Sequence, residues 1–180
     1  MVDINGGGFT LYTTIPISQA PYPHGLGKIG HEELETDMKQ LLGIHHGNQT
    51  ANEQAFWTPR YQRLLNHHLK PFFDPAGDIV EIARQATAHA HSNPVLNQRL
   101  PSTPDAQIRY RAQMPTLGPE VPQEVVRWRD HPPEITRYAD GVTRYGNGRH
   151  RLSYLRSRIQ PIDPNFQVLV KLDHIEHQWS

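Results

Sequence analysis

Cysteine is absent from this chain of 180 residues, and its absence excludes several kinds of chemistry. Without a thiol there are no disulfide bridges, no thiolate ligands for zinc and no cysteine nucleophile. Lysine is also scarce, because only four of the 18 basic residues are lysines and the others are arginines. Arginine presents a planar fork of donors that suits bidentate binding of anions, although a GC-rich genome would favour arginine in the same way. The composition therefore fits an anion-binding protein without demanding one.

Long hydrophobic runs are missing too. No apolar run approaches the length of a membrane-spanning helix, and the first residues lack the charged and then hydrophobic pattern of a signal peptide. We therefore expect a soluble, cytoplasmic protein that does not bind membranes; the alternative is an effector that is secreted without a signal peptide. Acidic and basic residues balance overall, with 18 of each, but residues 105–160 hold ten arginines against six acids, a local balance of +4. An anionic ligand would favour this second half.

The first half of the chain shows mainly helical patterns. A Gly- and Pro-rich lead-in over residues 1–29 contains one predicted strand, Phe9–Ile17, which Pro16 should end or keep at a sheet edge. Apolar spacing then predicts helices from about residue 31 to 42, between residues 51 and 69, and from 75 or 78 to 90. Thr58 followed by Pro59 is a typical helix start. The Pro-, Ser- and Asn-rich residues 92–106 predict a linker.

After this linker the pattern becomes one of strands mixed with short helices. Alternation of apolar and polar residues predicts a half-buried strand over 107–114, and a short helix is expected over 121–129. Further strands are predicted over 135–140, 142–145 and 167–172, with a helix over about 148–158. We therefore predict an α+β fold with two parts. A helical N-terminal region, residues 1–104, packs on a small mixed-sheet domain, residues 105–180.

The segment from Asp140 to Leu152 carries the strongest functional signal. It reads Asp-Gly-Val-Thr-Arg-Tyr-Gly-Asn-Gly-Arg-His-Arg-Leu, which predicts a short strand, a glycine turn and the start of a helix. A helix N-terminus offers unpaired N–H groups and partial positive charge, glycine lets a phosphate approach the backbone, and arginine adds donors. The segment therefore predicts a phosphate-binding site, with candidate residues Gly148, Arg149, Arg151, Arg144 and Asn147.

Together with the later run Gln-Val-Leu-Val-Lys-Leu from Gln167, this segment resembles the ParB/sulfiredoxin-like superfamily over about residues 105–175. In that family a Gly-x-[His/Arg]-Arg signature opens a helix after a hairpin and holds nucleotide phosphates. Gly148, His150 and Arg151 match the signature, which implies this role for them. Arg149 departs from it, since sulfiredoxins carry their reactive cysteine there and partitioning proteins commonly carry glutamate. Sulfinic-acid reduction is therefore excluded, and the lack of a helix-turn-helix pattern argues against a partitioning role.

The resemblance also implies a function, because some superfamily members are described as ParB-like nucleases. We expect an enzyme acting on a nucleotide or nucleic acid, a nuclease or a phosphate hydrolase or transferase, of the stand-alone effector or toxin type. His150 is the candidate general acid or base, since imidazole titrates near pH ~6.5. Asp140 is the candidate for orienting His150 or holding a metal, and Mg²⁺ would accompany a nucleotide. The structural alternatives are a hydrogen-bonding His150 at the helix start and Asp140 as a turn residue.

The rival hypothesis is a non-catalytic adaptor. Such a protein would bind a nucleotide or nucleic acid at the same glycine turn without turning it over, and its helical half would dock a protein partner. The absence of both family residues at position 149 favours this alternative. Turnover distinguishes the two hypotheses, because an adaptor leaves a bound nucleotide intact.

Three other features have two interpretations each. Among twelve histidines, His174 and His177, with acidic neighbours, form the best local candidate for a weak divalent-metal site, and ordinary polar surface is the alternative. Residues 57–69 interleave aromatic and basic side chains, which fits a nucleic-acid groove or a packed amphipathic helix. Arg156 and Arg158 either extend the basic patch or form the solvated face of their helix.

Overall fold

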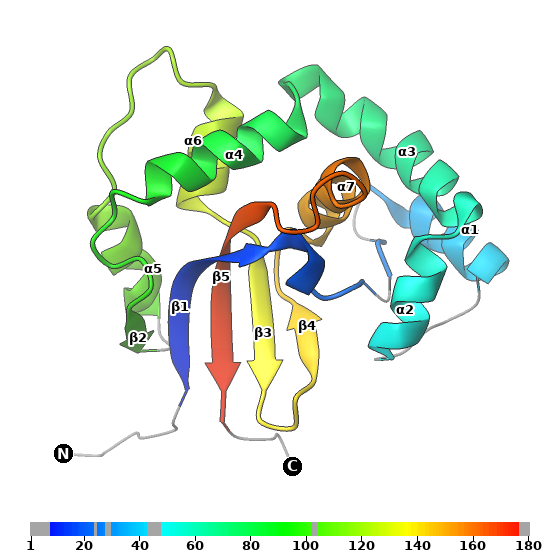
Figure 1. Ribbon diagram of the computed structural model, residues 1–180, viewed down its shortest axis with the longest axis horizontal. Helices are drawn as coiled ribbons and strands as arrows, with labels where there is room; N and C mark the ends of the chain where they lie inside the picture. The colour runs from blue at the N-terminus through cyan, green and yellow to red at the C-terminus, as the bar shows by residue number, and fades with distance from the viewer. Residues whose placement is uncertain (1–7, 24, 28–29, 43–47, 102–103, 177–180) are drawn as a thin grey trace.

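The computed structural model describes residues 8–23, 25–27, 30–42, 48–101 and 104–176. Its centre is a five-stranded mixed sheet in the order β2-β1-β5-β3-β4 (Figure 1). The strands are β1 (Phe9–Pro16), β2 (Arg99–Pro101), β3 (Glu134–Tyr138), β4 (Thr143–Tyr145) and β5 (Gln167–Ile175). Within the described residues seven α-helices accompany the sheet: α1 (Glu32–Leu42), α2 (Gln49–Phe56), α3 (Pro59–Phe73), α4 (Ile79–Ala90), α5 (Pro104–Ala112), α6 (Gln123–Asp130) and α7 (Arg149–Ile159). The mixed α and β composition confirms the coarse prediction.

β5 organises the sheet, because it pairs with β1 on one side and with β3 on the other. Its residues 168–170 are Val-Leu-Val and all three are buried, as expected for a strand covered on both faces. β1 runs antiparallel to β5, with Phe9 opposite His174 and Pro16 opposite Gln167, whereas β3 runs parallel to it. Pro16 ends β1, as predicted. The sheet thus joins strands from before and after residue 104, so the predicted division there does not follow the sheet.

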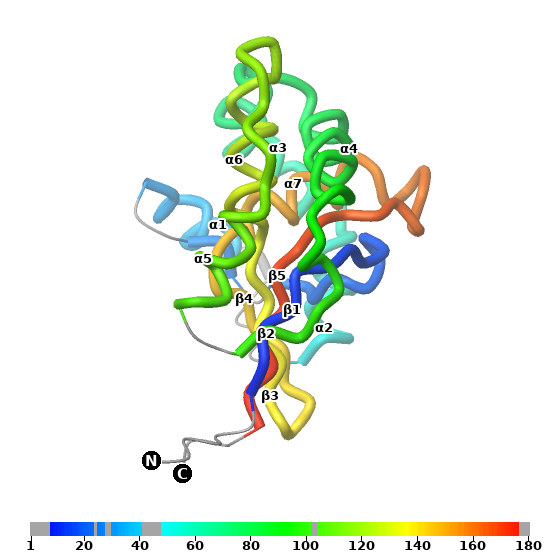
Figure 2. The backbone as a smooth tube through the Cα atoms, turned by 90° about the vertical axis from the view of Figure 1, so that its left-hand side faces the viewer, coloured from blue at the N-terminus to red at the C-terminus, as the bar shows by residue number. Residues whose placement is uncertain are grey.

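Four of the seven described helices gather at one end of the sheet. Figure 1 shows α3, α4, α6 and α7 at the end where β5 begins, while the β3–β4 turn, the start of β1 and the end of β5 lie at the other end. α4 packs on β5, α6 and α7, and it runs beside α6 over this end (Figure 2). One buried cluster includes Leu65 of α3, Ala83 of α4, Trp128 of α6 and Leu155 of α7. The helices of both halves therefore share one hydrophobic core.

The predicted strand over residues 107–114 is wrong, because residues 104–112 form the helix α5. The helix buries Ala106 and Tyr110, which are four residues apart and lie on one helical face, and it leaves Ile108 63% exposed. The Tyr110 ring stacks on Tyr12 of β1 with 3.7 Å between ring centroids, and its hydroxyl donates to Arg129 O at 2.8 Å. The alternation of apolar and polar residues therefore does not produce a strand, because the packing of Ala106 and Tyr110 favours a helix.

The other predicted elements largely agree with the structure. Thr58 caps α3 by accepting from Tyr61 N–H at 3.3 Å, and Asp78 caps α4 by accepting from Val80 N–H at 2.9 Å. α3 continues past its predicted end, with Pro71 in its last turn. The predicted helix between residues 51 and 69 is divided in the structure, because residues 49–56 form α2 and α3 begins at Pro59. β2, inside the expected linker, was not predicted. In the described part of the chain no helix is long and apolar enough to cross a membrane.

Candidate functional site

The glycine turn before α7 forms as predicted. Gly148 is the N-cap of α7 and has a left-handed backbone, with φ 84°. Glycine adopts this conformation readily, and a Cβ built on Gly148 would lie 2.8 Å from the Cα of Pro133. The turn is tied to the start of β3, because Glu134 N–H donates to Asn147 O at 2.8 Å. Gly146 N–H donates in turn to Glu134 O at 2.9 Å. These contacts place the first turn of α7 beside the residues that precede β3.

A cavity of about 450 Å³ opens at this turn. Three elements line it: the start of α7, the helix α6 with the residue that follows it, and the end of α3 with the turn after it. The lining side chains are Asn147, Gly148, His150, Arg151, Glu124, Arg127, His131, Phe72, Phe73 and Ala76. One wall is therefore aromatic, and each of the other two is polar and carries one arginine.

Arg151 is the most desolvated cation of this cavity. Its Nη2 donates to His131 O at 2.9 Å, and the centre of its guanidinium lies 5.3 Å from the centroid of the Trp128 ring. Burial and, next in size, the charge of the neighbouring Arg127 together lower the pKa of Arg151 to about 10. The side chain still carries its charge at pH 7. A desolvated charge interacts strongly with an opposite charge, so Arg151 is well placed to bind an anion.

Arg127 adds a second cation on the α6 wall. Its Nη1 donates to Glu124 at 3.0 Å and 3.2 Å from the two carboxylate oxygens, and its side chain is 59% exposed. Glu124 is the single carboxylate among the lining residues. The cavity wall therefore has two guanidinium groups against one carboxylate, and it keeps an excess of positive charge. Arg127 was not among the predicted site residues, because it lies 24 positions before Arg151 in the sequence.

Arg149 and His150 have structural partners. The guanidinium of Arg149 donates to Gly27 O, and Nε2 of His150 contacts Leu26 O. Because a carbonyl oxygen can only accept, Nε2 carries the proton in this contact. The His150 ring is 4% exposed and stacks on His31 with 4.8 Å between centroids. These contacts fit the structural alternative for His150, and its role as a general acid or base stays a prediction.

Asp140 and Arg144 lie outside the cavity. Asp140 is in the β3–β4 turn, whereas Gly148 follows the other end of β4. Figure 1 shows this turn at the far end of the hairpin from α7. Its Oδ1 accepts from Val142 N–H at 2.9 Å, which is the geometry expected of a turn residue. Arg144 is exposed on β4, with its guanidinium 5.6 Å from the centroid of the Tyr138 ring. The structure therefore does not bring the predicted pair of Asp140 and His150 together.

His131 is a second residue of the cavity that the sequence analysis missed. It follows α6, and Arg111 of α5 holds it, with Nη2 of Arg111 2.5 Å from Nδ1 of His131. Arg111 Nε also donates to Asp130 O at 3.3 Å. His131 is an exposed residue, but partial burial of its ring lowers its pKa, and Arg111 is the next largest cause. His131 carries no motif in the sequence, so only the packing of α5 against the end of α6 reveals it.

Both interpretations of Arg156, as part of the basic patch or of the solvated face of its helix, are wrong. Arg156 is 1% exposed and belongs to the interior, whereas Arg158 is exposed as predicted. The guanidinium of Arg156 donates to Ile17 O at 2.9 Å, to Pro21 O at 3.1 Å and to Ala20 O. Arg156 thus holds the segment after β1 against α7 and does not extend the basic patch.

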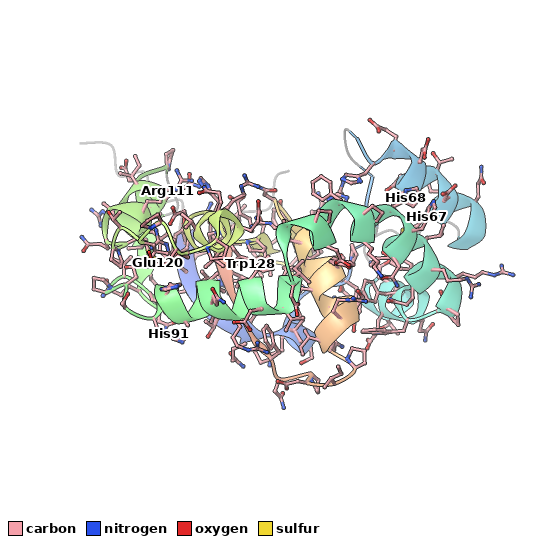
Figure 3. The ribbon with its side chains drawn as sticks, turned by 90° about the horizontal axis from the view of Figure 1, so that it is seen from above. His67, His68, His91, Arg111, Glu120 and Trp128 are labelled. Atoms are coloured by element: carbon pink, nitrogen blue, oxygen red, sulfur yellow. The ribbon has the colours of Figure 1, made fainter. Side chains whose placement is uncertain are left out.

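The histidines do not gather into a metal site in the part of the chain that the structure describes. Figure 3 shows His67 and His68 on α3, well apart from His91 at the end of α4. His174 stacks on Phe9 with 4.2 Å between ring centroids, and burial lowers its pKa. His177, its predicted partner, lies outside the described residues. The metal site at these two histidines therefore stays a prediction.

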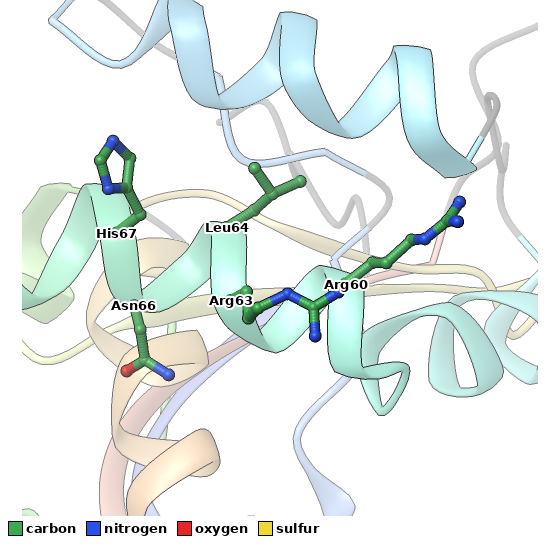
Figure 4. Close-up of a pocket in the computed structure, with 5 residues that line it drawn as sticks. All are labelled: Arg60, Arg63, Leu64, Asn66 and His67. Atoms are coloured by element: carbon green, nitrogen blue, oxygen red, sulfur yellow. The ribbon is translucent and has the colours of Figure 1, made fainter.

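α3 is a packed amphipathic helix. Tyr61, Leu65 and Leu69 are buried in the core. A broad, open pocket of about 830 Å³ lies on its other side, lined by Arg60, Arg63, Leu64, Asn66 and His67. Figure 4 shows these side chains on α3, with Leu64 pointing toward α1. The packed-helix interpretation is confirmed, and a nucleic-acid groove on the outer face stays a prediction.

Comparisons with family models, with curated proteins and with solved structures found no match for this chain. The resemblance to the ParB/sulfiredoxin-like superfamily therefore stands only on the residues of the 140–152 segment and of the later run from Gln167.

Proposed function

We propose that this protein binds a phosphate-bearing ligand, a nucleotide or a nucleic acid, in the cavity at the start of α7. The observation that carries the proposal is the composition of that cavity. Arg151, in the N-terminal turn of α7, and Arg127 of α6 supply positive charge, and Phe72 and Phe73 form an aromatic wall. Helix N–H groups and guanidinium groups bind phosphate oxygens, and an aromatic wall suits a base.

Some of the predicted residues near the glycine turn bind the ligand in this proposal, and others do not. Gly148 lets Pro133 pack against the turn and so holds the first N–H groups of α7 at the cavity. Asn147 and Arg151 supply further polar contacts, and Arg127 joins them from α6. Arg149 has Gly27 O as its partner, and Arg144 and Asp140 lie elsewhere on the hairpin. The proposed site is therefore smaller than the predicted one on α7 and gains a wall from α6.

On this basis we propose an enzyme of ParB-like type that acts on a nucleotide or nucleic acid, as a stand-alone effector or toxin. His150 is its candidate acid or base, and Mg²⁺ would arrive with the phosphates of a nucleotide. The competing proposal is a binding adaptor whose helical half docks a protein partner. The contact between His150 and Leu26 O favours the adaptor, because it occupies one ring nitrogen of the candidate acid or base.

The first test is ligand binding by thermal shift, with ATP, ADP, CTP, GTP, NAD and a short DNA, each with and without Mg²⁺. A ligand at 100 times its dissociation constant should stabilise the protein by about 2.7 kcal/mol. Overnight incubation of the bound ligand with Mg²⁺ or Mn²⁺ then separates the two proposals. Product formation supports the enzyme, and an intact ligand supports the adaptor.

Removing either guanidinium group of the cavity should weaken this binding. We expect Arg127→Gln and Arg151→Gln each to raise the dissociation constant about tenfold, because a hydrogen bond to a charged group contributes about 1.5–3 kcal/mol. Isothermal titration calorimetry measures the effect. The matched control is Arg84→Gln, since Arg84 also pairs with a glutamate three residues before it and is similarly exposed, 56% against 59% for Arg127. Unchanged affinity in both cavity variants would contradict the proposed site.

A further inference from the structure

His131 is held at the cavity by contacts from three directions. Its backbone N–H donates to Arg127 O at 2.9 Å, and its backbone carbonyl accepts from Arg151 at 2.9 Å. Its ring meets Arg111, whose Nη2 is 2.5 Å from Nδ1. Arg111 is itself placed by its second contact, from Nε to Asp130 O at 3.3 Å. Both the backbone and the ring of His131 are therefore positioned before any ligand arrives.

The contact with Arg111 decides where the ring carries its proton. A guanidinium group has five donors and no acceptor, so Nδ1 of His131 must present a lone pair to it. A neutral ring with a lone pair on Nδ1 carries its proton on Nε2. Nε2 is then the one ring nitrogen of His131 that can donate to a ligand in the cavity.

Partial burial and the neighbouring arginines keep the ring of His131 neutral. Arg111 and Arg151 oppose its protonation, whereas Asp130 and Glu134 favour it, and Glu124 and Arg127 also line the cavity. Burial is the largest influence, and together these groups lower the pKa of His131 below its ordinary value. At pH 7.5 the ring is therefore uncharged and donates from Nε2.

We propose that His131 is a neutral hydrogen-bond donor of the cavity, held in the Nε2–H tautomer by Arg111, and that it binds a phosphoryl oxygen of the ligand. This inference rests on the proposed phosphate site and adds a residue to it. Arg111 is a positioning residue, because it acts through the ring and does not line the cavity. His131 binds without transferring a proton, in contrast to the role predicted for His150.

The test combines affinity with nitrogen chemical shifts, using inorganic pyrophosphate as the probe at pH 7.5. Long-range ¹H–¹⁵N spectra of the ¹⁵N-histidine protein should show His131, assigned by its loss in His131→Ala, with Nε2 protonated and Nδ1 not. Pyrophosphate should shift Nε2 of His131 in a saturable way. His131→Ala should raise the dissociation constant about tenfold, as for a hydrogen bond to a charged group. His131→Gln should stay within about threefold of the wild type, since its amide is also a neutral donor.

Arg111→Gln tests the positioning role with a readout that a purely structural contact would not move. The pKa of His131 should rise, because a neighbouring positive charge is removed, and the Nδ1 resonance should move. Pyrophosphate binding should weaken roughly threefold as the ring loses its fixed orientation. Arg109→Gln, which removes an exposed arginine from the same helix, should change none of these.

Different failures overturn different claims. A proton on Nδ1 at pH 7.5 overturns the proposal for His131 and Arg111. If Arg127→Gln and Arg151→Gln weaken pyrophosphate binding but His131→Ala does not, the donor role falls and the phosphate site stands. If pyrophosphate does not bind the wild type at all, the phosphate site and the donor role fall together.

Discussion

Replacing Arg156 by methionine is expected to lower the free energy of unfolding by about 3 kcal/mol, because several buried carbonyl oxygens lose a charged donor. The guanidinium of Arg156 donates to the backbone oxygens of Ile17, Ala20 and Pro21, and its centre lies 3.9 Å from the centroid of the Tyr22 ring. Each unsatisfied acceptor costs about 1–3 kcal/mol. Ile17 O also accepts from Ala20 N–H, and Pro21 O from the Tyr145 hydroxyl, so these two oxygens keep a donor. We therefore expect the full penalty at Ala20 O and smaller losses at Ile17 O and Pro21 O, which together give the total of about 3 kcal/mol.

Urea denaturation and thermal melting measure this loss. For a chain of this size about 3 kcal/mol corresponds to a fall of roughly 6–12 °C in Tm. The matched control is Arg158→Met on the same helix, which removes an exposed arginine and should change the stability by less than about 0.5 kcal/mol. Arg156→Lys should lie between the two, because an ammonium group keeps the charge but lacks the planar fork. An Arg156→Met variant as stable as the Arg158 control would refute the structural role of this side chain.

Replacing Gly148 by alanine is the second large effect that the structure predicts. The left-handed backbone at φ 84° costs a residue with a Cβ about 1–2 kcal/mol. The new methyl group would also lie 2.8 Å from the backbone Cα of Pro133, and overpacking of this kind costs about 1–3 kcal/mol. We therefore expect a total loss of about 2–5 kcal/mol. Because Gly148 is the cap of α7, ligand binding at the cavity should be lost as well.

Gly141→Ala separates the two causes. Gly141 has a nearly identical φ of 83°, but nothing lies within 4 Å of a Cβ built there. Its substitution should therefore cost only the backbone strain, about 1–2 kcal/mol. Equal losses in the two variants, measured by urea denaturation, would show that Pro133 moves aside and that the close approach at Gly148 has no energetic role.

Signals that act within a few residues were predicted well. Thr58 and Asp78 begin helices because their side chains accept from N–H groups two or three residues ahead. Gly148 was predicted on the same local grounds, since a glycine between a strand and a helix indicates a special backbone conformation. Such interactions need no knowledge of the distant chain, so their residues can be identified from the sequence.

The strand predicted over residues 107–114 was wrong because a contact with a distant part of the chain determines the structure there. Ile108, Tyr110, Ala112 and Met114 alternate as in a strand, but the helix needs only Ala106 and Tyr110 on one face to pack on Tyr12 and Leu100. A short segment with few apolar residues fits both periods, and the neighbouring strand decides between them. β2 is a comparable case, because a strand of three residues has no pattern until β1 supplies its partner.

In the candidate site too, some features follow from the local sequence and others only from tertiary packing. Local sequence determines the glycine turn, the start of α7 and the presence of Arg151 beside them, because these follow from backbone conformation and residue order. Tertiary packing alone places Arg127 and His131 of the α6 wall and Phe72 of α3 at that turn, and it assigns Arg149 and His150 to backbone oxygens near residue 27. It also buries Arg156. These outcomes depend on contacts between residues far apart in the chain, whose energies appear only once the sheet and its helices have come together.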